Sequence, residues 1–360
     1  MSSYNNYEDA VRADNERRQR AKMLKRRRAK RIKIIKRRIG AAVVVAGIGI
    51  IAVVATHINA KYKDSTITQN ETIEVAADNY SADDNIQENK KVNEYATISP
   101  SYVEVTSEQV KSPNVALLDV DNNQIIAGRN ADIKIYPASM TKVMTLIVAV
   151  ENLKDTNATL TFTNAMLYDF YRENATVAGF LDNETVDVED MLYGLILPSG
   201  ADAALGLAML TSGSEEAFVE LMNQKCTELG LKNTHFVNTS GLHDPEHYTT
   251  PIEMAMIMKY AMSIPECAKV LSTYQYTTKA TQQHPEGILL TSTMFSRMYG
   301  NEVEGVTIKA GKTGYTSEAL QCLVSYAVKG EHSYIAVTTG STNKWHSIFD
   351  DFEIYKTYLP

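Results

Sequence analysis

Ser139 and Lys142 place a nucleophile and a base three residues apart in the sequence. Lys142 is the only charged side chain between residues 135 and 150, and that run is otherwise mostly apolar. Residues three apart project from one face of a helix, and apolar surroundings favour the neutral amine of a lysine. A neutral amine beside a serine hydroxyl can take its proton. The pattern therefore predicts a serine nucleophile with its own base at the start of a buried helix.

A structural interpretation of the same pair remains open at this point. Ser139 could cap the helix that Pro137 precedes, and Lys142 could extend its ammonium group to solvent. A Ser-x-x-Lys match is a weak signal by itself. The chain contains a second one, from Ser341 to Lys344, in a polar stretch that follows a strand-like run. The other motifs decide between this structural interpretation and the catalytic one.

Two further motifs follow in the order that a known signature requires. Ser199-Gly-Ala201 lies in a break between two helical patterns, and Lys312-Thr-Gly314 follows a strand-like run at residues 306–309. Taken singly, the serine is a helix cap and the lysine a solvated strand end. The order Ser-x-x-Lys, Ser-x-x, Lys-Thr-Gly is the signature of penicillin-binding proteins and β-lactamases.

Four segments together carry a more specific resemblance. They are residues 137–142 (PASMTK), 197–203 (LPSGADA), 235–250 (HFVNTSGLHDPEHYTT) and 308–316 (IKAGKTGYT). From about Asn114 to the C-terminus the chain resembles the low-molecular-mass penicillin-binding proteins, which are serine D-Ala-D-Ala carboxypeptidases. The resemblance implies removal of the terminal D-alanine from peptidoglycan stem peptides, with β-lactam antibiotics as covalent inhibitors and no cofactor.

The resemblance also implies a role for each motif residue. Ser139 attacks the carbonyl of the penultimate D-alanine, Lys142 takes its proton, and Ser199 relays a proton to the leaving amine.

Lys312, Thr313 and Gly314 form the substrate-binding motif, in which the lysine and the threonine hydroxyl hold the terminal carboxylate of the peptide. The backbone N–H groups of Ser139 and Tyr315 form the oxyanion hole.

One departure from the family pattern leaves two alternatives in view. The second motif usually ends in Asn, and here Ala201 occupies that position, so an amide contact to the substrate is missing or supplied elsewhere. A non-catalytic wall-binding protein of the same fold is one alternative. A β-lactamase is the other, although the Glu-x-x-Leu-Asn pattern that supplies an activated water in many of them is not found between the second and third motifs.

Neither the histidines nor the cysteines predict a metal site. His243 and His247 are four apart, but Pro245 between them is incompatible with a shared helix face. We therefore expect a structural loop at the edge of the cleft. The three cysteines, at 226, 267 and 322, are far apart and lie in apolar periodic segments, which predicts buried free thiols.

The N-terminal region predicts a membrane anchor. The first 38 residues contain fifteen lysines and arginines and four acidic residues, so the rest of the chain has a formal charge of −18 within a total of −7. Residues 39–58 contain no acidic residue, lysine or arginine, and twenty helical residues span roughly 30 Å of bilayer. The basic flank places the N-terminus in the cytoplasm and the remainder outside the cell membrane. A signal peptide cleaved after Ala60 is the less favoured alternative, and the membrane explains the basic tail without nucleic acid.

Four regions follow from this pattern: a basic tail at 1–38, a transmembrane helix at 39–58, a disordered extracytoplasmic linker at 59–112 and a catalytic domain at 113–360. The linker is polar, acidic and without glycine. In the domain, strand-like runs occur near both ends and helical patterns between them. We therefore expect an α+β fold of the β-lactamase and DD-peptidase type, with an antiparallel sheet built from both chain ends and a helical subdomain.

Overall fold

The computed structural model describes residues 94–173, 175–298 and 303–360. The predicted basic tail, the predicted membrane span and the linker up to residue 93 lie outside this range. By contact density the chain divides into the units Met1–Asp78 and Asn79–Pro360, and every described residue belongs to the second. None of the described helices is long and apolar enough to cross a bilayer.

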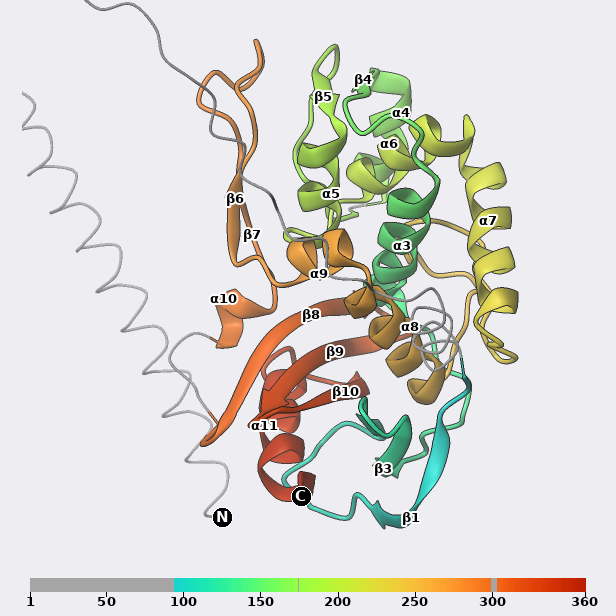
Figure 1. Cartoon of the computed structure of the whole chain (residues 1–360). Helices are drawn as coiled ribbons and strands as arrows, with labels where there is room; N and C mark the ends of the chain where they lie inside the picture. Colours follow the sequence, from blue (N-terminus) through green and yellow to red (C-terminus); the bar gives the residue numbers. More distant parts are fainter. Residues whose placement is uncertain (1–93, 174, 299–302) are drawn as a thin grey trace, which may run out of the picture. The chain divides into compact units, whose positions relative to one another are not determined.

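Within the described residues the main sheet has six strands in the order β1-β3-β2-β10-β9-β8 (Figure 1). Their bounds are Thr97–Glu104 (β1), Asn114–Asp119 (β2), Gln124–Arg129 (β3), Val306–Thr316 (β8), Leu320–Lys329 (β9) and His332–Ser341 (β10). The prediction of an α+β domain with a sheet from both chain ends is confirmed. The prediction of a purely antiparallel sheet is wrong, because β1 pairs with β3 in parallel.

Strand β1 also corrects the predicted linker. The disordered segment was expected to extend to residue 112, but residues 97–104 pair with β3 and Val105 and Val110 are buried. Most side chains of β1 are exposed, and Ser99 is its one buried residue. An edge strand with one buried side chain carries no clear alternation of apolar and polar residues, so its sequence does not differ from that of a polar linker.

Helices cover both faces of the sheet (Figure 1). Helix α8 (Pro251–Ser263) packs on the face that carries Val337, and α11 (His346–Tyr358) packs on the face that carries Ala336. Neighbouring residues of a strand point to opposite faces, which explains why one strand serves two cores.

The helical part lies in the chain between strands β3 and β8. It contains α3 (Lys142–Asn152), α4 (Asn164–Arg172), α5 (Val188–Ile196), α6 (Ala201–Ser212), α7 (Glu215–Glu228), α9 (Pro265–Leu271), α10 (Phe295–Met298) and the short strands β4 (Thr159–Thr161), β5 (Thr185–Asp187), β6 (Gln275–Thr277) and β7 (Leu289–Thr291). Side-chain caps begin two of the helices: Ser214 Oγ accepts the N–H of Ala217 at α7, and Thr250 Oγ1 accepts the N–H of Glu253 at α8.

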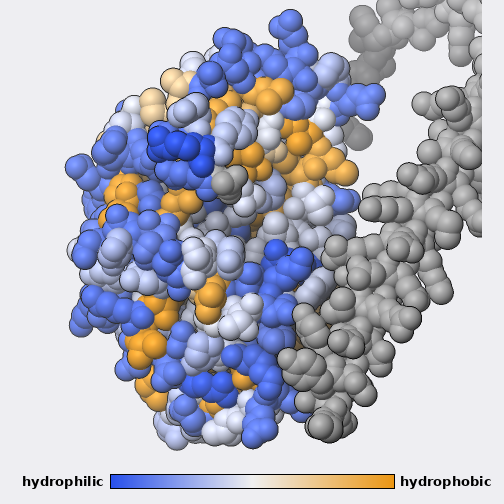
Figure 2. All heavy atoms as spheres, turned by 180° about the vertical axis from the view of Figure 1, so that it is seen from behind, coloured by the Kyte–Doolittle hydropathy of each residue, from blue (hydrophilic) through white to orange (hydrophobic). Residues whose placement is uncertain are grey.

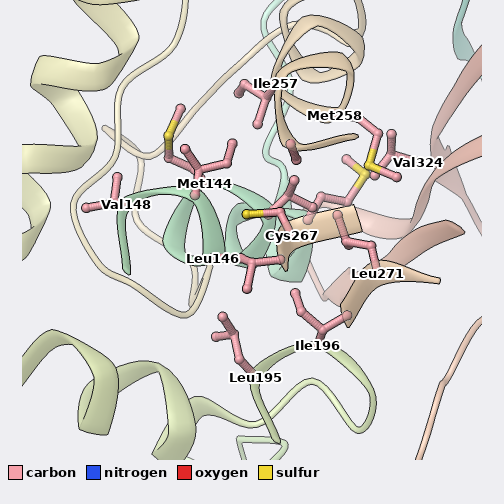
Figure 3. Close-up of a cluster of buried hydrophobic side chains, with 14 of the residues drawn as sticks. Met144, Leu146, Val148, Leu195, Ile196, Ile257, Met258, Cys267, Leu271 and Val324 are labelled. Carbon is pink, nitrogen blue, oxygen red and sulfur yellow. The ribbon is translucent and has the colours of Figure 1, made fainter. Parts of the chain in front are cut away.

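Helix α3 is the centre of the main core. Its residues from Lys142 to Ala149 are all buried, and Figure 3 shows Met144, Leu146 and Val148 among side chains of the neighbouring helices. All three cysteines are buried free thiols, as predicted. The opposite view in Figure 2 shows apolar side chains in separate groups on a largely hydrophilic surface. A helix buried on all sides holds its first residues rigidly, and those are the predicted catalytic residues.

Candidate active site

A cavity of about 390 Å³ lies at the start of α3. Five chain segments far apart in sequence meet in it. Its lining includes Ser139, Lys142, Ser199, Ser240, Tyr315 and Thr316. The structure therefore brings the first, second and third motifs to one pocket.

Ser139 and Lys142 are arranged as a nucleophile and its base. Ser139 lies in a short 3₁₀ turn, Ala138–Thr141, that runs directly into α3. The Nζ atom of Lys142 is 3.0 Å from Ser139 Oγ and 2.5 Å from the carbonyl oxygen of Ser240. Ser139 makes no side-chain capping hydrogen bond in this turn, and Lys142 is only 2% exposed. The interpretation as a helix cap and a solvent-directed ammonium is therefore wrong.

Burial changes the protonation of Lys142. Loss of hydration lowers its pKa to about 7, and the charge of Asp202 opposes this shift. Asp202 is itself buried and accepts the N–H groups of residues 178, 179 and 180, so its charge is already compensated by backbone dipoles. At neutral pH a large fraction of Lys142 is therefore a free amine, which a general base requires.

Ser199 and Lys312 form a second hydrogen-bonded pair. Nζ of Lys312 donates to Ser199 Oγ at 2.8 Å and to the carbonyl of Thr313 at 2.7 Å. Ser199 has a positive φ of 74° between α5 and α6, a conformation that non-glycine residues adopt at a cost and mostly at functional sites. Burial, followed by the charges of Lys142 and Arg297, holds the pKa of Lys312 well below its ordinary value.

Strand β8 passes close to the nucleophile at Gly314. A Cβ atom there would lie 2.9 Å from the carbonyl oxygen of Pro137 and 3.1 Å from the nitrogen of Ser139. Only glycine fits this approach, which brings the next residue, Tyr315, into the lining of the cavity beside Ser139. The two backbone groups predicted for the oxyanion hole thus come from adjoining segments.

Lys312 reaches the cavity through its hydrogen bond to Ser199 but is not itself among the lining residues, and neither is Thr313. The hydroxyl of Thr313 is 2.6 Å from that of Thr293 and does not line the cavity, whereas the hydroxyl-bearing Thr316 does.

The loop from residue 237 to residue 247 belongs to one of the four family motifs, and the sequence alone predicts no catalytic role for it. The structure places Ser240, Gly241 and Leu242 in the cavity wall. His247 is buried, its Nδ1 accepts the N–H of Val237, and its Nε2 lies 2.8 Å from Thr141 Oγ1. Burial lowers the pKa of His247 to about 3, so this imidazole is a neutral support for the turn that carries the serine, as expected of a structural loop.

Comparison with known proteins identifies the family. Residues 101–343 match the family described as peptidase S11, D-alanyl-D-alanine carboxypeptidase. The chain belongs to this family.

Among its relatives are two named D-alanyl-D-alanine carboxypeptidases. DacF of Bacillus subtilis strain 168 is 34% identical over 239 residues, which cover 64% of this chain and 58% of DacF. DacA of Haemophilus influenzae is 33% identical over 269 residues, which cover 70% of this chain and 65% of DacA. The chain thus spans about three-fifths of the length of these relatives.

Solved structures agree with the family at the level of the fold. The DD-transpeptidase of Streptomyces K15 superposes with a TM-score of 0.64 at 27% identity, covering 71% of this chain and all of the other. A D-alanyl-D-alanine carboxypeptidase of Mycobacterium tuberculosis H37Rv, at 24% identity and a TM-score of 0.61 over 71% of this chain and 94% of the other, shares the fold.

Proposed function

We propose that this protein is a serine D-Ala-D-Ala carboxypeptidase that removes the terminal D-alanine from peptidoglycan stem peptides. The observation that carries the proposal is the buried amine of Lys142 at 3.0 Å from Ser139 Oγ, in a cavity shared with Ser199. Membership of the S11 family supports the reaction class. The comparisons do not favour the β-lactamase alternative, since the named relatives and neighbours are DD-peptidases.

Acylation begins with transfer of the Ser139 hydroxyl proton to the neutral amine of Lys142. The oxygen attacks the carbonyl carbon between the two D-alanines and forms a tetrahedral intermediate. In this proposal the backbone N–H groups of Ser139 and Tyr315 stabilise the oxyanion, and both residues line the cavity.

The leaving amine needs a proton when the C–N bond breaks. Ser199 is suited to relay to it the proton that Lys142 took from Ser139, because its oxygen accepts a hydrogen bond from Lys312 and its own O–H makes no other hydrogen bond among the described residues. Lys142 thereby returns to the neutral amine. D-Alanine then leaves, and water releases the shortened peptide and restores Ser139.

The terminal carboxylate of the substrate has a cation to bind in Lys312. Burial lowers the pKa of Lys312, and a carboxylate that enters beside it favours the charged form. Binding of the peptide and protonation of Lys312 are thereby coupled. Thr316, which lines the cavity, offers the hydroxyl contact that was predicted for Thr313.

We also propose a location, which rests on the sequence alone. Residues 39–58 would anchor the chain in the cell membrane, with the basic tail in the cytoplasm and the domain outside. Protease treatment of intact cells should digest the domain and leave a short protected N-terminal fragment in the membrane. Recovery of a soluble chain that begins after Ala60 would favour the cleaved signal instead.

The activity is tested by incubating the protein with a pentapeptide that ends in D-Ala-D-Ala and measuring free D-alanine. Wild type should release it, and Ser139→Ala should not. A fluorescent penicillin should form a stable covalent band with wild type. Absence of both reactions would support the non-catalytic alternative, and rapid turnover of the penicillin would support the β-lactamase.

A further inference from the structure

The direction of the Lys142 lone pair decides whether this residue works as a base. A neutral amine has two N–H bonds and one lone pair, and the lone pair must point at the hydroxyl of Ser139 to take its proton. An N–H donated to the carbonyl of Ser240 at 2.5 Å fixes one of the three directions around Nζ. The position of that single carbonyl therefore orients the base.

The Ser240 carbonyl is held by one side chain that does not touch Lys142. Oδ1 of Asn238 accepts the N–H of Ser240 at 3.2 Å, its O–H at 3.3 Å and the N–H of Gly241 at 2.7 Å. Nδ2 of Asn238 donates to the carbonyl of Leu242 at 2.9 Å. One amide thus closes a tight turn around the peptide unit whose oxygen faces Lys142.

The same turn packs closely against the segment that carries Ser139. Gly241 has a φ of 80°, and any Cβ on it would overlap the carbonyl of Ala138. Thr145, one turn after Lys142, donates to the carbonyl of Thr239 at 2.7 Å, and Thr239 is held by Glu215 at 2.6 Å. The turn therefore has little room to shift as a whole, and its internal shape depends on Asn238.

The opposite wall of the cavity offers no equivalent group. Ala201 lines it where the family pattern has an amide side chain, and among the described residues Nζ of Lys142 has hydrogen bonds to Ser139 and Ser240. We propose that Asn238 is the positioning residue for the general base, holding the Ser240 carbonyl that aims the Lys142 lone pair at Ser139. This inference rests on the proposed function.

Several charged and titratable groups lie around Lys142, and Glu173, His243 and Glu318 line the same cavity. Lys312 on β8 and Asp202 on α6 act on it through their charges, and His247 lies in the supporting loop. Asn238 adds no charge to this set in the native protein. A carboxylate at position 238 would add one, and would favour the charged form of Lys142.

The test compares variants in acylation by benzylpenicillin, resolving the noncovalent dissociation constant from the acylation rate constant. Asn238→Ala removes all four hydrogen bonds of the amide. We expect its acylation rate constant to fall about 10- to 100-fold, the loss typical of a base displaced by a fraction of an ångström to one ångström. The noncovalent constant should change less than about threefold, since the walls of the cavity are kept.

Asn238→Asp is the conservative rescue. It keeps an acceptor for the three donors, so its acylation rate at high pH should stay within about threefold of wild type. The added negative charge should move the acid limb of the pH–rate profile to higher pH by about half a unit to one unit. The shift reports that position 238 lies close to Lys142, and recovery of the acylation rate constant at high pH, absent in Asn238→Ala, is the readout that a merely structural role would not move.

Asn223→Ala is the matched control. Asn223 is also an amide that holds this region, through two hydrogen bonds to the backbone of Phe236, but it does not reach the Ser240 turn. Asn223→Ala should lower the melting temperature by about as much as Asn238→Ala does. It should leave the acylation rate constant and the pH profile of that rate constant unchanged.

Two results would overturn the inference. One is an acylation rate constant of Asn238→Ala equal to that of the control; the other is an unshifted acid limb in a folded Asn238→Asp. Failure of the proposed function is distinguishable, because it would show as a wild type that neither binds penicillin covalently nor releases D-alanine.

Discussion

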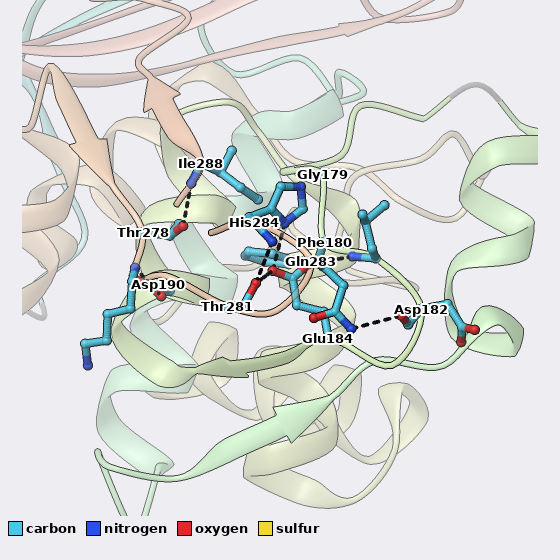
Figure 4. A network of polar contacts seen from close by, with 12 residues as sticks. Gly179, Phe180, Asp182, Glu184, Asp190, Thr278, Thr281, Gln283, His284 and Ile288 are labelled. Atoms are coloured by element: carbon cyan, nitrogen blue, oxygen red, sulfur yellow. Dashed lines mark hydrogen bonds and ion pairs between the residues drawn. The ribbon is translucent and has the colours of Figure 1, made fainter. Parts of the chain in front are cut away.

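The cavity and the β6–β7 hairpin bury ionisable side chains in opposite ways. In the cavity two lysines, Lys142 and Lys312, are almost fully buried, and their hydrogen bonds go to neutral oxygens. Beside the hairpin, Glu184 and Asp190 are equally buried, but each accepts hydrogen bonds from several donors of the hairpin segment (Figure 4). We call this second group the hairpin clamp.

The contacts of the hairpin clamp are typical of structural burial. Glu184 accepts from Thr281 at 2.6 Å and from His284 at 2.8 Å, and Asp190 accepts from Tyr276 at 2.7 Å. Hydrogen bonds to the charged form offset its loss of hydration. The lysines of the cavity lack that compensation, which costs stability and leaves an amine free to react. Between these two regions, the one with incompletely satisfied buried charge is the one that holds the predicted catalytic residues.

The largest expected effect comes from Lys142→Met, which keeps the shape and removes the amine. Acylation by penicillin should fall about 10²- to 10⁴-fold, the usual contribution of a general base. The free energy of unfolding should rise by about 1–4 kcal/mol because a buried, poorly paired amine is gone.

The stability part of this prediction depends on pH. The folded pKa of Lys142 is about 7, below its ordinary 10.5, so the unfolded chain binds the extra proton between these values. Burial of Lys142 therefore lowers the free energy of unfolding of wild type most below pH 7. This loss becomes smaller as the pH rises towards 10.5. Thermal unfolding at pH 6 and pH 9 measures this, and a gain for Lys142→Met that is larger at pH 9 would contradict the account.

Glu184→Ala tests the other half of the comparison. It leaves the donors of Leu181, Thr281 and His284 without their carboxylate, so we expect a loss of about 2–4 kcal/mol in urea unfolding. The acylation rate should stay within about twofold of wild type. Glu266→Ala is the control, because its carboxylate is exposed and pairs with an exposed lysine, and should change stability by less than about 1 kcal/mol.

The smallest effect concerns Asp351, a buried carboxyl on α11. One of its oxygens accepts the hydroxyl of Ser325, while the other has no partner among the described residues. Burial raises its pKa to about 8 from 3.8, so the folded protein binds the proton and loses stability as pH rises through that interval. Asp351→Asn should gain about 1–2 kcal/mol relative to wild type between pH 5 and pH 7 in urea titrations. If the free energy of unfolding of Asp351→Asn relative to wild type is the same at pH 5 and pH 7, Asp351 is charged in the folded protein and the account is contradicted.

The parts of the site that depend on local sequence could be predicted. The Ser139 and Lys142 pair lies within one helical turn, and Ser199 follows from a break between two helices. The contact between Lys142 and Ser240 joins residues 98 apart. The periodicity of the sequence does not indicate contacts between residues so far apart. Thr313 is predicted to bind the substrate because its motif is a linear string, and the contact between its hydroxyl and that of Thr293 joins residues 20 apart. Strand β1 was missed because its exposed, polar residues resemble a linker.

The central claim is that the neutral amine of Lys142 activates Ser139, and the pH dependence of acylation tests it most directly. The rate of covalent labelling by benzylpenicillin, followed by intact mass between pH 5 and pH 9, should rise with pH and reach half its maximum near pH 7, where Lys142 loses its proton. The adduct should map to the peptide that contains Ser139. A rate that is constant across this range, or an adduct on another residue, would contradict the account.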